Sequence, residues 1–151
     1  MAVGFSSVDD ELFREIILDH YRNPRHKGGL DPADVTLEAN NPLCGDEILL
    51  SLRLRQGAVE GIAFSGRGCS ISQASASMMC DSVAGKPTDE ASATVQRFRD
   101  MMLAEGGVDG LGDLEALQGV KRYPVRVKCA LLPWNALLQG LADGSAGENR
   151  P

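Results

Sequence analysis

The chain has 151 residues, of which 43% are hydrophobic and 5% aromatic, so it can build one compact core from mostly aliphatic side chains. Its net charge of -6 argues against nucleic acid and anionic membranes as partners, because both require clustered Lys and Arg, and favours a basic partner protein. No apolar run approaches the roughly 20 residues that a membrane-spanning helix needs.

The role of the cysteines depends on the cellular compartment, which the N-terminus helps to indicate. Residues 1–10 are polar and acidic and lack the charged and apolar regions of a signal peptide. We therefore expect a cytoplasmic protein, in which thiols stay reduced. In that setting the four cysteines indicate metal binding or catalysis rather than two disulfides: Cys44, Cys69, Cys80 and Cys129.

Hydrophobic spacing predicts a first helix over residues 10–22, which ends at the Asn-Pro pair of residues 23–24. A basic turn follows this pair. The spacing places five apolar or aromatic side chains on one helical face: Leu12, Phe13, Ile16, Ile17 and Tyr21.

Alternation of apolar and polar residues then predicts an antiparallel meander. The turn between the second and third strands is Gln56-Gly57, and the Gly-Arg-Gly of residues 66–68 is expected to end the third strand. The three strands are predicted over 35–40, 46–55 and 58–65.

The rest of the chain is predicted to be helical, over 70–84, 89–104, a short segment near 113–118, and 124–142. Pro133 must kink the last helix or begin a second segment. We expect a single domain over residues 1–151, with 143–151 as a disordered tail. Strands followed by helices predict an α+β fold, in which helices pack on one face of a small antiparallel sheet of about three strands.

Four side chains could converge on one metal ion. Cys44 lies in the turn between the first two strands, and Asp46, two residues later, points to the same side of extended chain. Cys69 stands at or just before a helix N-terminus, where unpaired N–H groups stabilise a thiolate, and Cys129 comes from the last helix. Three thiolates and a carboxylate suit tetrahedral zinc. Spacing alone leaves buried, inert cysteines as the alternative, since the chain has no C-x-x-C pair.

The remaining metal-binding residue types are predicted to be structural. Cys80 follows Cys69 at roughly 16 Å along a continuous helix, too far to share one ion, and is expected in the core. His20 is predicted on the surface of the first helix, His26 in the following loop, and Trp134 in the core.

Three stretches resemble the SufU branch of the IscU/NifU-N family of iron–sulfur cluster assembly proteins. They read NPLCGD at 41–46, GRGCSISQASASMM at 66–79 and RVKCALLPW at 126–134. The resemblance runs from about Leu12 to Leu141 and implies an IscU-like fold. Lys128 stands where scaffold-type members carry a His, and residues 102–122 look like the insertion of SufU-type members.

The resemblance also implies roles for individual residues. The zinc ligands would be Cys44, Asp46, Cys69 and Cys129, with Cys44 also the sulfur acceptor and Arg126 beside the site. The protein would act as a sulfurtransferase that takes persulfide sulfur from a PLP-dependent cysteine desulfurase of the SufS type. A downstream SUF scaffold would be a further partner.

Two other functions stay open from the sequence. The same donors could bind iron and assemble a [2Fe–2S] cluster on a scaffold protein. A closed site could also be a structural zinc module that serves only as an adaptor. For Arg126, the alternative is a surface salt bridge.

Overall fold

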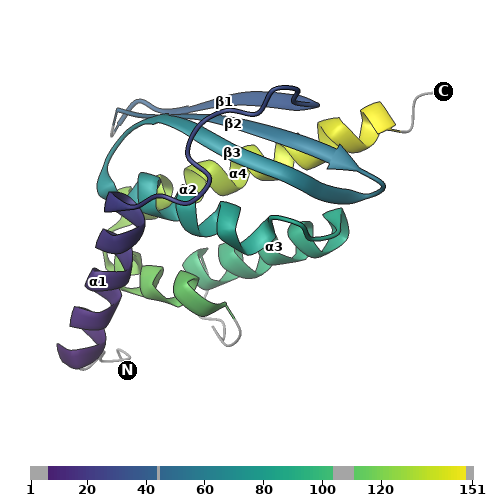
Figure 1. Ribbon diagram of the computed structural model, residues 1–151. Coiled ribbons are helices and arrows are strands. Elements are labelled where there is room, and N and C mark those ends of the chain that lie inside the picture. The colour runs from purple at the N-terminus through teal and green to yellow at the C-terminus, as the bar shows by residue number, and fades with distance from the viewer. Residues whose placement is uncertain (1–6, 44, 104–110, 149–151) are drawn as a thin grey trace.

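The computed structural model describes residues 7–43, 45–103 and 111–148, and shows a three-stranded antiparallel sheet whose helices all lie against one face (Figure 1). The α+β fold predicted from the sequence is confirmed. The strand order is β1-β2-β3, with β1 Val35–Asn41, β2 Asp46–Arg55 and β3 Ala58–Arg67.

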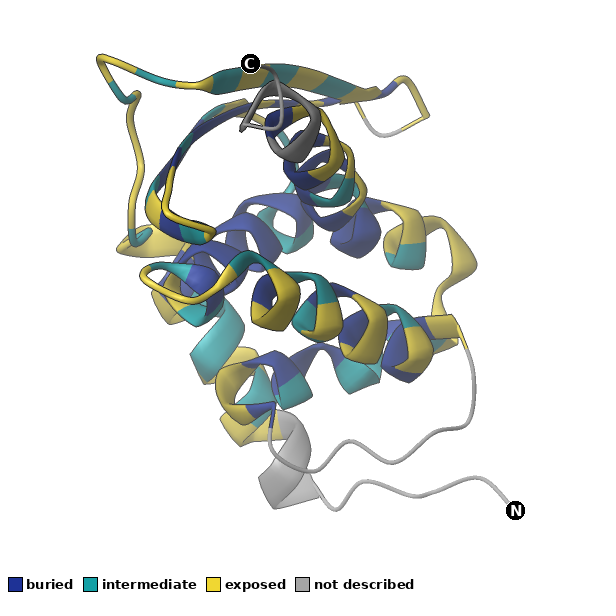
Figure 2. Cartoon of the chain, turned by 90° about the vertical axis from the view of Figure 1, so that its right-hand side faces the viewer, coloured by how far each residue is buried: buried dark blue, intermediate teal, exposed yellow. Residues whose placement is uncertain are grey.

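Three of the described helices contact the sheet, and the others complete the layer beneath it. α4 packs against β1 and β2, and both α2 and α3 pack against β3, while α1 lies on α2 and on η1, a 3₁₀ helix. Buried residues lie on the sides of these helices that face one another and the sheet (Figure 2). The helices are α1 Ser7–Arg22, α2 Ser70–Val83, α3 Thr88–Leu103, η1 Gly112–Arg122 and α4 Pro124–Glu148.

The central strand confirms the predicted alternation. The side chains of Ile48, Leu50, Leu52 and Leu54 are buried beneath the sheet. The turn that follows has positive φ angles at both Gln56 and Gly57, as a two-residue hairpin turn requires.

β3 runs beyond the predicted range of 58–65, because the strand continues through Gly66 to Arg67, which pairs with Glu47. Gly66 has φ 118°, and a Cβ atom there would overlap the carbonyl oxygen of Glu47. Glycine at this position therefore allows β3 to stay paired with β2 at the point where another residue would separate them.

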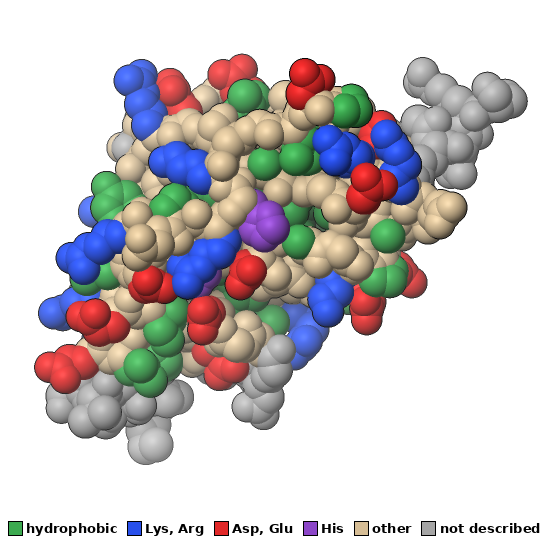
Figure 3. All heavy atoms as spheres, viewed as in Figure 1, with side chains coloured by type: hydrophobic (Ala, Val, Ile, Leu, Met, Phe, Trp, Pro, Cys, Tyr) green, Lys and Arg blue, Asp and Glu red, His purple; other side chains and the backbone are tan. Residues whose placement is uncertain are grey.

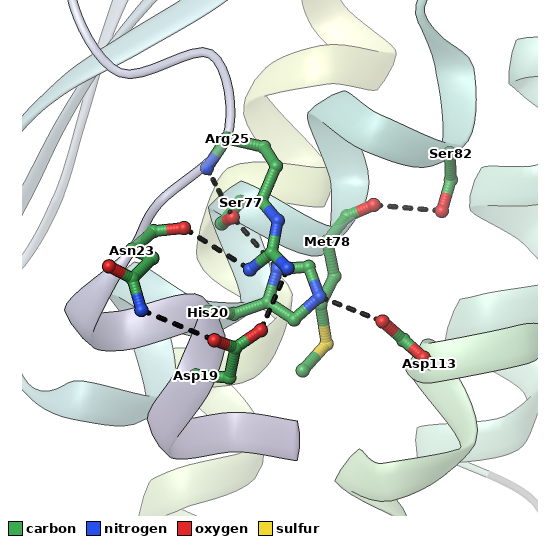
Figure 4. Close-up of polar contacts among 8 residues, drawn as sticks. All are labelled: Asp19, His20, Asn23, Arg25, Ser77, Met78, Ser82 and Asp113. Atoms are coloured by element: carbon green, nitrogen blue, oxygen red, sulfur yellow. Dashed lines mark hydrogen bonds and ion pairs between the residues drawn. The ribbon is translucent and has the colours of Figure 1, made fainter. Parts of the chain in front are cut away.

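α1 is present as predicted, but its buried face differs. Leu12 and Tyr21 are exposed, whereas His20, predicted on the surface, is only 1% exposed. The ring of His20 bonds Ser77 Oγ through Nδ1 at 2.8 Å and Asp113 Oδ2 through Nε2 at 2.9 Å (Figure 4). These bonds satisfy both ring nitrogens, which makes burial of the polar ring possible. His26 lies exposed in the loop, as predicted.

α4 also departs from the prediction. It runs through Pro133 as one helix, so no second segment begins there, and it extends to Glu148, which makes most of the predicted disordered tail helical. Residues 149–151 lie outside the described part of the chain. The predicted core residues Cys80 and Trp134 are fully buried, and the Trp134 ring stacks on Phe98 at 4.4 Å between centroids.

The short helix predicted near 113–118 is η1, which is longer than expected. No helix that the structure describes is both long and apolar enough to cross a membrane. On the face shown in Figure 3, acidic and basic side chains are interspersed.

Candidate metal centre

Three segments that are distant in the sequence meet at one end of the sheet. Asp46 is the first residue of β2 and pairs with Asn41, the last residue of β1. Because β2 is the central strand, its start also lies beside the end of β3, where Glu47 pairs with Arg67. Cys69 follows two residues after Arg67, so the order of the strands brings Cys69 next to Asp46.

A direct hydrogen bond joins these two residues. Cys69 has extended backbone angles, φ -69° and ψ 166°, and is the N-cap of α2, as predicted. Its backbone N–H donates to Asp46 Oδ1 at 2.8 Å, and its Sγ lies 3.9 Å from Asp46 Oδ2. The carboxylate thus satisfies one of the free N–H groups at the helix start and keeps its second oxygen on the sulfur side.

The close approach of Asp46 depends on Gly68. A Cβ atom at this position would lie 2.5 Å from Asp46 Oδ1 and 2.6 Å from Ser72 Oγ. Ser72 Oγ donates to the carbonyl oxygen of Cys69 at 3.1 Å and lies 3.8 Å from the Cys69 sulfur. Gly68 therefore leaves the space in which the carboxylate and the serine surround Cys69.

Cys129 reaches the same place from α4 and is fully buried. Its Sγ lies 3.8 Å from Asn41 Nδ2, an N–H donor, and 3.5 Å from the carbonyl oxygen of Val125, one helical turn earlier. The Asn41 amide can therefore donate to the sulfur whether it is a thiol or a thiolate, and it connects the end of β1 to α4.

A short chain of hydrogen bonds holds α4 against α2. Trp134 Nε1 donates to Ser75 Oγ at 3.0 Å, and Ser75 Oγ donates to the carbonyl oxygen of Ala130 at 2.6 Å. All three groups are buried. Because Ala130 directly follows Cys129, this link also fixes the position of the cysteine relative to α2.

The ligand atoms of Asp46, Cys69 and Cys129 all lie within 4.8 Å of one another. Tetrahedral zinc with bonds of about 2.0–2.3 Å holds neighbouring ligand atoms roughly 3.5–3.8 Å apart, so a small inward movement is enough. Asp46 is 1% exposed, and a buried carboxylate facing two sulfur atoms is stabilised by a cation. The donor set therefore fits zinc.

The chain matches the family described as NifU-like N terminal domain over residues 12–130. It belongs to this family. The NifU-like chain is 46% identical over 147 residues to the zinc-dependent sulfurtransferase SufU of Bacillus subtilis (strain 168), covering 96% of this chain and 99% of the relative.

A second relative is described as a scaffold protein and not as a sulfurtransferase. The NifU-like chain is 40% identical over 134 residues to the iron–sulfur cluster assembly scaffold protein IscU of Streptococcus pyogenes serotype M1, covering 87% of this chain and 84% of the relative. Among solved structures, a nitrogen-fixing NifU-like protein (N-terminal) from Brucella abortus matches with a TM-score of 0.84 and 26% identity, covering 93% of this chain and 99% of that one.

The structure brings three of the four predicted ligands of the NifU-like chain together. The fourth, Cys44, lies outside the described residues, so its place in the site stays a prediction. Arg126 is exposed in the first turn of α4, next to Val125, and its role beside the site also stays a prediction. Cys80 is buried in the core within α2, as expected.

The sequence analysis missed the residues that support the ligands, namely Gly68, Asn41 and Ser72. Ser72 follows Cys69 by three positions, so the two lie on the same side of the first helical turn, and this spacing could have indicated the contact. Asn41 could not be found in this way, because its contact to Cys129 spans 88 positions of the chain.

Proposed function

We propose that this NifU-like chain is a zinc-binding sulfur acceptor, which takes persulfide sulfur from a cysteine desulfurase and passes it on for iron–sulfur cluster assembly. The observation that carries the proposal is the convergence of Asp46, Cys69 and Cys129 within 4.8 Å. The similarity to a zinc-dependent sulfurtransferase over nearly the whole of both chains supports it.

Hydrogen bonds from neighbouring groups would hold Asp46 and Cys129 in place as zinc ligands. Asp46 would bind zinc through Oδ2 while Oδ1 keeps the hydrogen bond from the Cys69 N–H group. Cys129 would bind through a sulfur that also accepts from the Asn41 amide. Zinc, when bound, keeps its cysteine ligands deprotonated near neutral pH.

Cys44 is our proposed fourth ligand and acceptor. Its thiolate attacks the outer sulfur of the desulfurase persulfide, so a new S–S bond forms on Cys44 while the old S–S bond breaks and leaves the desulfurase cysteine as a thiolate. Arg126 would pair with the anionic sulfur of Cys44. The chain is thus a sulfurtransferase in the stoichiometric sense.

The donor would be a PLP-dependent cysteine desulfurase of the SufS type, and the receiver a downstream SUF scaffold. The compartment would be the cytoplasm, where thiols stay reduced.

The test is metal analysis and persulfide mapping on one purified sample after incubation with desulfurase and cysteine. We expect one zinc per chain and a sulfane sulfur on Cys44, and no sulfur on a Cys44→Ala variant. Asp46→Ala should lose zinc, whereas Asp81→Ala, at an exposed site on α2, should retain it. Sulfur uptake by Cys44→Ala at the normal rate would remove Cys44 from the acceptor role.

A scaffold that assembles a [2Fe–2S] cluster is the second candidate, favoured by the similarity to the S. pyogenes scaffold protein and by a donor set that can also bind iron. The visible spectrum of protein purified without oxygen separates the two functions. A colourless zinc protein supports the acceptor, and an iron protein with charge-transfer bands supports the scaffold.

A further inference from the structure

A groove of about 480 Å³ lies between α1, η1 and the start of α2. Its lining includes apolar side chains from all three elements, among them Phe13, Ile17, Ile71 and Val120. Two arginines, Arg14 of α1 and Arg122 of η1, also line it. The groove therefore combines an apolar surface with positive charge.

One end of this groove lies beside the candidate metal centre. Ser70 lines the groove and directly follows the predicted ligand Cys69. Tyr123 lines both the groove and an adjoining hollow, which Val125 also lines. The carbonyl oxygen of Val125 contacts the sulfur of Cys129. The groove and the adjoining hollow therefore lie next to the segments that carry two of the predicted ligands.

The two walls of the groove are held at a defined separation. His20 of α1 bonds Asp113 of η1 and Ser77 of α2, and the backbone N–H of Arg25 donates to the same Ser77 Oγ at 2.8 Å (Figure 4). The His20–Ser77 bond is buried, whereas Asp113 is exposed and holds the ring of His20 from the solvent side. The groove is therefore formed before any partner arrives.

The groove and the adjoining hollow are lined by positive charges, whereas the whole chain carries a net negative charge. Arginines contribute to both hollows, at Arg14, Arg122 and Arg126, and the described residues that line them include no Asp or Glu. Tyr123 and Val125 are 58% and 52% exposed there. The net charge of -6 favoured a basic partner, but this surface is complementary to an acidic one.

We propose that the groove between α1 and η1 docks an acidic surface segment of the cysteine desulfurase that also carries apolar side chains. This inference rests on the proposed function, because a protein that delivers sulfur to the metal centre must cover the end of the groove that lies beside it. Its carboxylates meet Arg14 and Arg122, and its apolar side chains pack on Ile17 and Tyr123.

The test compares Arg14→Glu and Tyr123→Ala with Lys86→Glu in the full-length zinc protein. Arg14 and Lys86 are both exposed, and Lys86 lies beyond the opposite end of α2, about 20 Å from Cys69, so its variant is a matched control for the same change of charge. For each variant we measure the affinity for the desulfurase. We also measure how the rate of persulfide transfer depends on the concentration of the variant. Both measurements are made at low and at high salt.

At low salt we expect Arg14→Glu to bind the desulfurase about tenfold more weakly than the unmodified protein, with a KM for the acceptor raised by about the same factor and little change in kcat. At high salt the difference between Arg14→Glu and the unmodified protein should shrink, because salt screens the lost charge interaction. Tyr123→Ala should weaken binding at both salt concentrations, because it removes apolar contact rather than charge. Arg14→Lys should recover most of the affinity, and Lys86→Glu should behave as the unmodified protein. Zinc content should be equal in all of them.

Unchanged affinity in both Arg14→Glu and Tyr123→Ala would overturn the docking proposal. So would a change of oligomeric state without a change in desulfurase affinity, because the groove would then hold a second copy of this chain. Failure of the unmodified protein to accept sulfur would instead contradict the proposed function, and the binding measurement would still decide whether the desulfurase uses the groove.

Discussion

At the scale of single residues, the described cysteines differ because of what surrounds each sulfur. Cys69 is partly exposed at the start of a helix, beside a carboxylate, while Cys129 is buried next to an amide donor. Cys80 is buried in the core, and burial raises the pKa of its thiol far above the ordinary value. The same residue type thus supplies two candidate ligands and one inert core side chain.

The inertness of Cys80 can be measured by alkylation of the metal-free protein. Because its pKa is raised, the thiol stays protonated throughout pH 7–9, and we expect no modification of Cys80 by iodoacetamide over that range. Cys69 should react and serves as the internal control, and urea should make Cys80 reactive. Peptide mass spectrometry that finds Cys80 alkylated in the folded protein would contradict this assignment.

Gly68 offers a second prediction at this scale. In Gly68→Ala the added methyl group would meet both Asp46 Oδ1 and Ser72 Oγ, so the carboxylate must move away from Cys69. We expect zinc affinity to fall by about tenfold or more, since a displaced ligand loses its geometry. Chelator competition measures this, with Gly29→Ala as control, because a Cβ atom there meets nothing within 4 Å. Equal affinities in the two variants would show that Asp46 does not need this space.

At the scale of elements, the sequence predicted what depends on local pattern. The alternation in β2, the Gln56-Gly57 turn and the cap position of Cys69 follow from neighbouring residues, and the structure confirms them. The burial of His20 could not be predicted, because its partners Ser77 and Asp113 lie 57 and 93 positions away. When its partners are unknown, a polar ring within a helix is predicted to lie on the protein surface.

The candidate site shows the same division between local and distant information. Resemblance to a family supplied the ligand set, but the contact between Asp46 and Cys69 follows from β2 being the central strand. The Gly-Arg-Gly segment of residues 66–68 was interpreted as a strand break. Its glycines instead allow two close approaches, one to Glu47 and one to Asp46, which only the folded arrangement reveals.

His20 should matter for the way α1, α2 and η1 pack together. His20→Ala removes the bonds to Ser77 and Asp113 and leaves a cavity, so we expect a loss of about 2–3 kcal/mol in the free energy of unfolding. Urea denaturation measures it, and His26→Ala, at an exposed loop position, should change stability far less. If both variants unfold at the same urea concentration as the unmodified protein, the His20 contacts contribute nothing to stability.

At the scale of the whole molecule, the candidate metal centre connects three parts of the fold. Asp46 belongs to the sheet, Cys69 to the junction of β3 and α2, and Cys129 to α4. An ion held by all three would exist only in the folded chain, since the ligands are separated by 23 and 60 positions in the sequence. Zinc binding is therefore expected to contribute directly to folding free energy.

Removal of zinc should lower the melting temperature by about 10 °C, because a ligand at a thousandfold excess over its Kd stabilises the folded state by about 4 kcal/mol, and each kcal/mol shifts Tm by about 2–4 °C at this size. Differential scanning calorimetry before and after chelation, and after zinc is restored, measures the change. Cys80→Ala should show the full difference between the two forms, since Cys80 lies apart from the site, and Asp46→Ala should show a much smaller one. A Tm that does not depend on zinc in the unmodified protein would mean that the three segments are held by packing alone, and that Asp46, Cys69 and Cys129 approach one another without binding a metal.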